Sequence, residues 1–478
     1  MMTTVKGKKM FLGGKWIEKD EVIHVYDPQD NSVISTVPKA SKADILAAIE
    51  AAEEGAKIAA NMPVHERITI INKAADYIEK NSDIFSETIA SEGSKTIKEA
   101  RGEVARCVNT LRLSAEEARR IIGETIPFDQ MPGHENRIGY YYNFPIGIVA
   151  AITPFNDPLN LVAHKVGPAI ASGNAIIVKP ATLTPLSALL LAEAFDDAGL
   201  PGKVLSVVTG SGGEIGDTLV THPSIRMVSF TGGLETGEKI AKKAGLKKLS
   251  MELGSNSPAI ILQDADINEA VNSCVAGAFG AVGQNCLGVQ RIFIETPNFD
   301  EFVHKFVNET NKYKTGNKKD EATDMGPLIS EKEAIRVEEW VNDALKDGAT
   351  LLTGGKRDGA FYSPTVLTNV PTDAKIAKEE IFGPVVILFE VKDLDEAIEK
   401  ANHVNYGLQA GIFTKDINLA FQAIKQLEVG GIMINDSSDY RIDGMPFGGV
   451  KGSGLGREGV KYTIQEMTEP KVVNFKLG

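Results

Sequence analysis

Apolar runs and amphipathic stretches alternate through the middle of the chain. Between residues 147 and 262, short apolar runs have the length of buried strands, at 148–152, 175–178, 204–208 and 227–230. Apolar residues with helical spacing occupy the intervals, at 159–170, 186–198, 215–220 and 235–244. This alternation is typical of a parallel sheet covered by helices on both faces. Ligands of such sheets bind beyond the carboxyl ends of the strands.

A second alternation of the same kind extends from residue 259 to about residue 429. Its apolar segments are separated by helical stretches and lie at 291–295, 385–390 and 410–414. Upstream of both alternations, three stretches have the composition of long helices that pack around the first sheet, at 42–55, 64–81 and 94–122. The sequence therefore predicts an α/β fold with two doubly wound α/β domains.

Two short extended segments, 140–144 and 471–475, flank the predicted domains. Such strands pair with each other or with another subunit. Because the second segment has no obvious partner in its own neighbourhood, we expect a homodimer or homotetramer. The expected organisation is a first domain of 1–122 and 146–252, a second of 253–435, a small β oligomerisation element of 123–145 and 459–478, and a loop of 436–458.

Charge and composition exclude several classes of protein. The 478 residues carry a formal net charge of −13 and no dense block of Lys and Arg, which argues against a nucleic-acid partner. The first residues lack the apolar core of a signal peptide, and no run has the length of a membrane span. We therefore expect a cytoplasmic protein without a membrane partner.

The chain has only three cysteines, Cys107, Cys274 and Cys286, and none belongs to a CxxC pair. This spacing indicates neither a disulfide framework nor a zinc site, and no metal site is predicted. In a reducing compartment each cysteine is either buried packing or a nucleophile.

Glycine-rich segments give no standard nucleotide fingerprint. The literal GxGxxG at 454–459 does not follow a strand inside a βαβ unit, so a tight glycine loop is the better interpretation. The segment 210–216 has its last glycine one place late, and 232–237 lacks the Lys-Ser/Thr of a P-loop. The first domain is therefore expected to bind a dinucleotide without the usual fingerprint.

Three residues could carry chemistry, although each also has a structural explanation. Cys286 follows a helix of small residues, where a cysteine is usually buried packing. Glu252 ends an apolar strand at a glycine, where a salt bridge is the commoner role. Asn156 begins the helix after the first strand, where a simple N-cap is the default.

Taken together, the motifs resemble those of the aldehyde dehydrogenase superfamily over essentially the whole chain. They follow the family's order: Thr153-Pro154-Phe155-Asn156, Lys179-Pro180-Ala181, Phe230-Thr231-Gly232, Glu252-Leu253-Gly254, Gly283-Gln284-Asn285-Cys286, Glu379-Glu380-Ile381-Phe382-Gly383-Pro384 and Pro446-Phe447-Gly448-Gly449. The chain is most similar to the branch that contains the non-phosphorylating glyceraldehyde-3-phosphate, succinate-semialdehyde and lactaldehyde dehydrogenases.

The resemblance implies NAD(P)-dependent oxidation of an aldehyde to its carboxylate through a thioester on Cys286. The Cys286 thiolate attacks the aldehyde, and the Asn156 amide and the Cys286 N–H hold the oxyanion. Glu252 activates the water that hydrolyses the thioester. By the same resemblance Lys165, whose default position is the surface, supports the Asn156 side of the site.

For the cofactor, the resemblance implies contacts from several strand-end segments of the first domain and from one loop of the second. These residues are Thr153, Pro154, Phe155, Lys179, Thr182, Gly212, Phe230, Gly232, Gly233, Leu253, Glu380 and Phe382. Members that prefer NAD commonly carry Glu three residues after the lysine, where a carboxylate repels a 2′-phosphate. Because Thr182 stands there, we expect NADP to be accepted, and a preference for it stays open.

Substrate selection is expected in the segment 436–458, which lines the substrate mouth in the resembling family. Arg441 in this segment suits a carboxylate, phosphate or sulfonate, although a surface salt bridge with Asp439 or Asp443 is an equal alternative. Arg106 and Arg112 could supply a second cation, while Asp157 and Asn285 indicate a polar mouth. A short polar or anionic aldehyde is therefore expected, and hydroxylated aldehydes such as lactaldehyde stay open.

Two other functions compete with this one. An acyl-CoA-forming dehydrogenase uses the same thiolate, but the presence of Glu252 favours water as the acceptor. A non-catalytic member acting as a binding protein would be expected to lack Cys286 or Glu252, and both are present.

Overall fold

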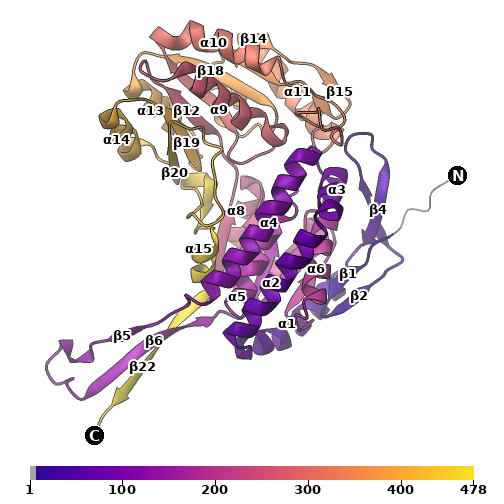
Figure 1. The fold of residues 1–478 in the computed structure, drawn as a ribbon, viewed down its shortest axis with the longest axis vertical. Helices are drawn as coiled ribbons and strands as arrows, with labels where there is room; N and C mark the ends of the chain where they lie inside the picture. The colour runs from indigo at the N-terminus through magenta and orange to yellow at the C-terminus, as the bar shows by residue number, and fades with distance from the viewer. Residues whose placement is uncertain (1–6) are drawn as a thin grey trace.

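The computed structural model describes residues 7–478 and contains two large sheets and a projecting three-stranded arm (Figure 1). The first sheet has the spatial order β2 (Lys15–Ile17), β1 (Met10–Leu12), β9 (Leu205–Val207), β8 (Ala175–Lys179), β7 (Ile148–Ile152), β10 (Met227–Thr231), β11 (Lys248–Glu252) and β21 (Gly454–Leu455). Its central strands, from β9 to β11, are parallel. The chain adds β8 and β9 on one side of β7, and β10 and β11 on the other. This reversal creates a crevice between β7 and β10, where ligands of such sheets bind.

Both faces of the first sheet are buried, because alternate residues of each strand point to opposite faces. Val149 and Ala151 pack with α2 (Val64–Lys80), α4 (Ile97–Ala118), α5 (Asn160–Ala171) and α6 (Leu186–Asp197). Ile148 and Ala150 pack on the other side with α1 (Lys42–Asn61) and α7 (Asp217–Thr221). Two further helices belong to this domain, α3 (Ser82–Glu92), which the sequence pattern did not separate, and α8 (Leu234–Ala244). The continuous apolar runs of the sequence are explained by this two-sided burial.

The second sheet has the order β14 (Thr350–Thr353), β17 (Thr365–Thr368), β18 (Val385–Val391), β13 (Val289–Glu295), β12 (Ser257–Ile261), β19 (Gln409–Phe413) and β20 (Gly431–Ile434). All neighbouring pairs are parallel except β14 with β17. The helices of this domain are α9 (Ile267–Phe279), α10 (Thr296–Thr310), α11 (Glu331–Lys346), α12 (Lys375–Lys378), α13 (Leu394–Asn402) and α14 (Ile417–Gln426). The predicted second α/β domain is therefore present. Two hairpins, β3 (Val22–Tyr26) with β4 (Val33–Pro38) and β15 (Arg357–Asp358) with β16 (Phe361–Tyr362), complete the strands outside the arm.

The arm consists of β5 (Glu124–Ile126), β6 (Arg137–Pro145) and β22 (Thr468–Lys476), and it projects from the body with the C-terminus at its tip (Figure 1). β22 pairs antiparallel with β6 from Thr468↔Pro145 to Lys476↔Arg137. Of the two alternatives expected for the extended segments 140–144 and 471–475, pairing with each other is therefore confirmed. The partner is distant in sequence and adjacent in space.

The last part of the chain returns to the first domain before it enters the arm. Helix α15 (Val460–Glu466) contacts α4 and α5, and Val460, Ile464 and Met467 belong to the core of that domain. β21, in the segment expected to be a loop, pairs with β11. Residues from this segment are thereby held against the carboxyl end of the first sheet. No helix among residues 7–478 combines the length and apolarity that a membrane crossing requires.

Candidate active site

Two cavities meet at Cys286. One, of about 370 Å³, lies beyond the carboxyl ends of β7, β10 and β11 and is called here the strand-end cavity. The other, of about 320 Å³, lies between α4 and the loops that carry Cys286 and Arg441, and is called the charged cavity. Cys286, Asn156 and Leu161 line both. The thiol can therefore be approached from two sides by two different molecules.

The strand-end cavity brings together most of the residues that the sequence motifs singled out. These are Thr153, Pro154, Phe155, Asn156, Phe230, Gly232, Gly233, Glu252, Leu253, Cys286, Glu380 and Phe382. Residues that the sequence did not single out also line it, namely Leu161, Ala181, Thr231, Thr236 and Gly254. Thr231 and Gly254 belong to the same motifs, so their position could have been found by extending each motif to all its members.

The crevice between β7 and β10 fits a dinucleotide. The hydroxyl oxygens of Thr153 and Thr231, at the ends of these strands, are buried and have no hydrogen-bond partner among residues 7–478. Gly233 precedes α8 and has open space where a side chain would stand, so the first amides of that helix are accessible. A helix N-terminus of this kind binds phosphate groups. The arrangement can hold a pyrophosphate without a standard glycine fingerprint.

Lys179, Thr182 and Gly212 lie outside the residues that line this cavity. Lys179 ends β8, its ammonium donates to the carbonyl of Pro180 at 2.9 Å, and burial lowers its pKa to about 8. A side chain at Gly212 would contact the Lys179 side chain, so the two are neighbours. The Thr182 hydroxyl donates to the carbonyl of Gly210 at 3.2 Å. Glu214, on the same segment as Gly212, is ion-paired with Lys39 at 2.9 Å.

The loop that carries the nucleophile is strained. Ala281, Val282 and Gly283 have φ values of 50°, 62° and 65°, and the left-handed region is unfavourable for a β-branched residue. The loop is fixed at both ends, because the Glu99 carboxylate accepts from the Ala281 N–H at 2.7 Å and the Gln284 side chain accepts from the Ile329 N–H at 3.0 Å. By contrast, Cys107 and Cys274 are buried within α4 and α9.

Donors for an oxyanion remain free beside the thiol. Neither the Asn156 amide nor the Cys286 N–H donates a hydrogen bond to another of residues 7–478. Burial raises the pKa of the Cys286 thiol to about 12, and the positive charge of Arg441 opposes this rise. Arg441 is therefore a protein charge that favours the reactive thiolate.

A buried ionic network lies behind Glu252. The Glu252 carboxylate is buried without a hydrogen-bond partner among residues 7–478, and burial together with the charge of Glu458 raises its pKa. Glu458 accepts from Lys165 at 2.9 Å and from Arg441 at 3.3 Å. Burial disfavours the ionised form of Glu458. The positive charges of Lys165 and Arg441 outweigh this effect of burial and hold the pKa of Glu458 low. Lys165 is completely buried and also donates to Ser229 at 2.9 Å, so its default surface position is wrong.

Glu458 was not among the site residues predicted from the sequence. It is a member of the GxGxxG segment 454–459, which forms β21 and a tight turn in which Gly456 and Gly459 have positive φ. The interpretation as a glycine loop explains the backbone, but it gave no reason to select the acidic residue within it. Only the packing of this loop against α5 brings Glu458 to Lys165.

Ser255 and Asn256, which directly follow the Glu252-Leu253-Gly254 motif, fix the loop that carries Glu380. The Ser255 N–H donates to Glu380 at 2.8 Å, and burial raises the Glu380 pKa to about 7. The buried Asn256 amide donates to the carbonyls of Ala377 and Glu379, each at 3.1 Å. Its oxygen accepts from the Arg291 Nε at 2.7 Å. These two residues therefore anchor a loop beside the strand-end cavity.

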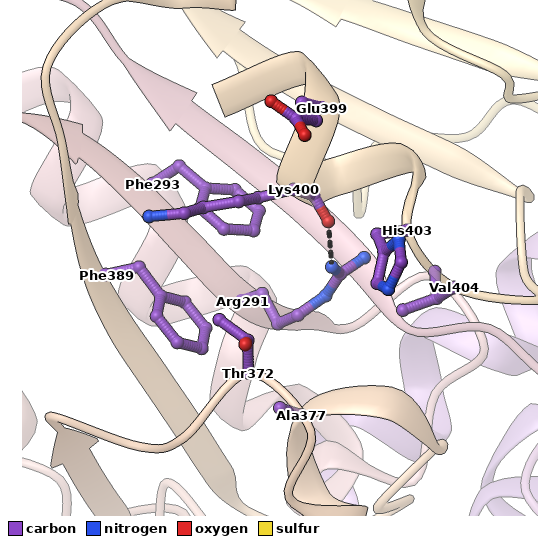
Figure 2. Close-up of a pocket in the computed structure, with 9 residues that line it drawn as sticks. All are labelled: Arg291, Phe293, Thr372, Ala377, Phe389, Glu399, Lys400, His403 and Val404. Carbon is purple, nitrogen blue, oxygen red and sulfur yellow. Dashed lines mark hydrogen bonds between the residues drawn. The ribbon is translucent and has the colours of Figure 1, made fainter. Parts of the chain in front are cut away.

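Arg291 also lines a smaller cavity of about 210 Å³ in the second domain (Figure 2). Its guanidinium donates to the carbonyl of Lys400 at 3.0 Å, as Figure 2 shows, and to that of Ala401 at 3.1 Å. None of the residues predicted to be catalytic lines this cavity. Its arginine therefore has a structural role.

The charged cavity contains Arg441, Arg106, Asp157 and Asn285 from the predicted substrate residues. The Arg441 guanidinium lies over the Phe447 ring at 3.7 Å, and its Nε is buried without a partner among residues 7–478. Its ion pair is with Glu458, in place of the surface pair with Asp439 or Asp443 that was considered. The sequence did not single out Lys95, Glu99, Glu103, Gln284 and Asp439, which also line this cavity.

Arg112 is not in the charged cavity. It is half-exposed on α4 and forms ion pairs with Asp76 at 3.2 Å and Glu79 at 2.6 Å. Six helical residues separate it from Arg106, which rotates its side chain by about 240° around the helix axis. The predicted position of Arg112 beside the substrate is therefore wrong, because the turn of the helix directs its side chain away from the charged cavity.

Comparison with known proteins agrees with this geometry. A model described as the aldehyde dehydrogenase family matches residues 16–473. The chain belongs to the aldehyde dehydrogenase family. It is 47% identical to the 3-sulfolactaldehyde dehydrogenase of Priestia megaterium, covering 100% of this chain and 99% of the relative. It is 50% identical to the aspartate-semialdehyde dehydrogenase 1 of Pseudomonas canavaninivorans, covering 94% and 96%.

A solved structure is also similar to this chain along nearly its whole length. It is that of the NADP-dependent glyceraldehyde-3-phosphate dehydrogenase from Bacillus halodurans C-125 complexed with NADP, which superposes with a TM-score of 0.97 at 40% identity over 99% of this chain and 100% of the other. The two-domain α/β fold is that of aldehyde dehydrogenases, and the activity of this member of the family is NAD(P)-dependent oxidation of an aldehyde to its carboxylate.

Proposed function

We propose that the physiological substrate is a short aldehyde with an anionic group at its far end. The observation that carries the proposal is Arg441, which is largely buried, lines the cavity that it shares with Cys286 and has an Nε without a hydrogen-bond partner among residues 7–478. A guanidinium binds two oxygens of a carboxylate, phosphate or sulfonate. The printed names of the relatives and of the solved structure given above refer to a sulfonate, a carboxylate and a phosphate, which supports this class of substrate.

In the first half-reaction, the aldehyde occupies the charged cavity, and the Cys286 thiolate attacks its carbonyl carbon. The Asn156 amide and the Cys286 N–H donate to the oxyanion that forms, and their free donors need no rearrangement to do so. When bound in the strand-end cavity, NAD(P) supplies the hydride acceptor. Loss of hydride leaves an acyl thioester on Cys286.

In the second half-reaction, Glu252 takes a proton from a water molecule, which then attacks the thioester and releases the carboxylate. Glu252 and Cys286 line the same cavity, and the raised pKa of Glu252 makes its ionised form a stronger base. Lys165 acts indirectly, because its ion pair with Glu458 fixes the charge that faces Glu252.

For the cofactor, we propose that Lys179 and Thr182 accept the adenosine end of NADP as well as of NAD. Lys179 has no ion-pair partner among residues 7–478, and Thr182 adds no charge that would repel a 2′-phosphate. Glu214, the acidic residue of the neighbouring segment, is paired with Lys39.

The substrate proposal is tested by kcat/KM with succinate semialdehyde, sulfolactaldehyde, glyceraldehyde-3-phosphate, lactaldehyde and hexanal. Because a charge-assisted hydrogen bond contributes about 1.5–3 kcal/mol, Arg441→Ala should lower kcat/KM for the anionic aldehydes roughly 10- to 150-fold more than for hexanal. Arg112→Ala is the matched control, since this arginine lies outside the cavity. Hexanal as the best substrate would overturn the proposal, and product release that requires coenzyme A would assign the thioester to a different acceptor.

We also propose that the arm formed by β5, β6 and β22 joins subunits into a dimer or tetramer. Ile138, Tyr142, Phe144, Val472 and Phe475 expose large apolar surface on it, which is typical of protein contacts. A monomeric mass in light scattering at micromolar concentration would contradict this.

A cytoplasmic location is proposed on the separate ground that a catalytic thiol is best kept reduced there.

A further inference from the structure

Some of the polar groups that line the charged cavity take no part in its ion pairs. Lys95 is paired with Glu103 and Asp157, and Arg106 is paired with Asp157 and Asp443. Asp157 is therefore occupied by two cations and is not free to bind a ligand.

Asp439 differs from these residues. It has no ion-pair partner among residues 7–478, and its one hydrogen bond is accepted by Oδ1 from the amide of Asn285. Its second oxygen has no partner in this part of the chain. Two nearly fully buried donors in the same cavity, the Arg441 Nε and the Gln284 Nε2, are also unused.

The position of Asp439 is fixed relative to the nucleophile. Its partner Asn285 directly precedes Cys286. The neighbouring Ser438 hydroxyl donates to the carbonyl of Leu287 at 2.7 Å, directly after Cys286. A side chain at Gly277 would stand 3.2 Å from the Asp439 Cβ, so α9 packs closely behind this loop. A rigid acceptor beside the thiol is what a specific subsite requires.

We propose that Asp439 and Asn285 form a second polar subsite that selects aldehydes bearing a hydroxyl or ammonium group on the chain between the aldehyde and its anionic end. Asp439 accepts a hydrogen bond from that group through its free oxygen. This inference rests on the proposed function, in which Arg441 binds the anionic end. It names a narrower class of substrate, one with a donor as well as an anion.

The electrostatics of the cavity agree with this role. Burial raises the pKa of Asp439 to about 7, while the Asn285 amide and the charge of Arg106 oppose the rise. A donor from the substrate would replace the solvation that burial removes. A substrate that lacks the donor leaves this carboxyl unpaired, and such a site discriminates strongly against it.

Matched pairs of substrates test the subsite while the anionic end stays constant. Aspartate semialdehyde differs from succinate semialdehyde only by an ammonium group, and sulfolactaldehyde differs from 3-sulfopropanal only by a hydroxyl group. We expect wild-type kcat/KM to be about 10- to 100-fold higher for the donor-bearing member of at least one pair. The pair that shows the preference identifies ammonium or hydroxyl as the donor.

Variants at Asp439 decide whether this residue is responsible. Asp439→Ala should abolish the preference, and the isosteric Asp439→Asn should abolish a preference for ammonium but keep part of a preference for hydroxyl. Tyr440→Phe is the control, because Tyr440 is the next residue on the same segment, is exposed and does not line the cavity. Equal rates within both wild-type pairs, or an undiminished preference in Asp439→Ala and Asp439→Asn, would overturn the subsite.

These outcomes are separable from failure of the proposed function. The proposed function fails if succinate semialdehyde and the neutral aldehyde hexanal react equally well in wild type and in Arg441→Ala. The ratio within a matched pair is measured between two aldehydes that carry the same anionic group and does not depend on that result.

Discussion

The two cavities that share Cys286 recognise ligands by opposite means. Among residues 7–478, no Lys or Arg lines the strand-end cavity, whose wall is made of strand-end backbone, glycines, threonines, aromatic side chains and the two carboxyl groups of Glu252 and Glu380. The charged cavity contains Lys95, Arg106 and Arg441 together with Glu99, Glu103, Asp157 and Asp439. The side proposed for the cofactor therefore has no cationic side chain, and the side proposed for the substrate has charged side chains of both signs.

The difference shows why one fold can serve many aldehydes. Most of the strand-end cavity lies where parallel strands of one sheet end, so the topology of that sheet positions most of its wall, and the second domain adds Cys286, Glu380 and Phe382. The charged cavity is built from α4, the nucleophile loop and the segment near Arg441, which are joined only by packing. Side chains there can change without disturbing the cofactor site.

The largest effect is expected where the two cavities meet. Cys286→Ala should lower turnover by about 10⁴-fold or more, because it removes the proposed nucleophile, which lines both cavities. Cofactor binding, measured by fluorescence titration of NADPH, should remain. Cys107→Ala and Cys274→Ala are the controls, since both thiols are buried in helices. Loss of activity in either control, with Cys286→Ala active, would reassign the nucleophile.

The next effect separates the two half-reactions. Asn156→Ala should slow the pre-steady-state burst of NADPH by about 10²- to 10³-fold, because it removes an oxyanion donor. Glu252→Gln should keep the burst and then stall at the thioester. Stopped-flow absorbance distinguishes the two variants. A steady-state rate for Glu252→Gln equal to wild type would remove Glu252 from the mechanism.

The same step has a defined pH dependence. Glu252 acts as a base only when it is deprotonated, and burial together with Glu458 raises its pKa. The steady-state rate should therefore rise with pH and reach half its maximum well above the ordinary pKa of a glutamic acid. A profile that is flat above pH 5, with hydrolysis still rate-limiting, would contradict this assignment.

A smaller effect is expected at Thr182, which lies outside the strand-end cavity and is proposed to face the adenosine end of the cofactor. Thr182→Glu should lower kcat/KM for NADP relative to NAD by about 10- to 100-fold, because a carboxylate repels the 2′-phosphate. Thr182→Gln is the control that adds bulk without charge. If wild type already uses NADP orders of magnitude less well than NAD, the proposal for Thr182 fails.

The smallest effect concerns the strained loop shared by both cavities. Val282→Gly should relieve left-handed strain of about 1 kcal/mol, but it also loses a side chain that is buried in the core of the second domain. Val275→Gly, inside α9, is the control, because it loses a similarly buried side chain without relieving strain. Val282→Gly should therefore lower the thermal unfolding temperature less than Val275→Gly does, while the burst rate falls because Cys286 is held less firmly. An equal or larger loss of unfolding temperature for Val282→Gly would show that the loop is not strained.

The sequence by itself determined the α/β class, the order of strands and helices, and the segments that meet in the strand-end cavity. Glu252 was predictable because it ends an apolar run, and parallel strands end at one edge of a sheet. Thr153 and Phe230 were implied as cofactor residues by the family resemblance. The position of Cys286 among them was implied by family resemblance and not by periodicity.

Only the tertiary structure decided which charged residues line the cavity beside Cys286. Helix phase placed Arg106 in the charged cavity and turned Arg112 to the surface. Packing across hundreds of residues brought Glu458 to Lys165 and paired β22 with β6, and the fold of the segment between Arg441 and Glu458 brought those two residues together. Such contacts depend on how finished elements stack, and residue type and local spacing carry no record of which distant partner neutralises a buried charge.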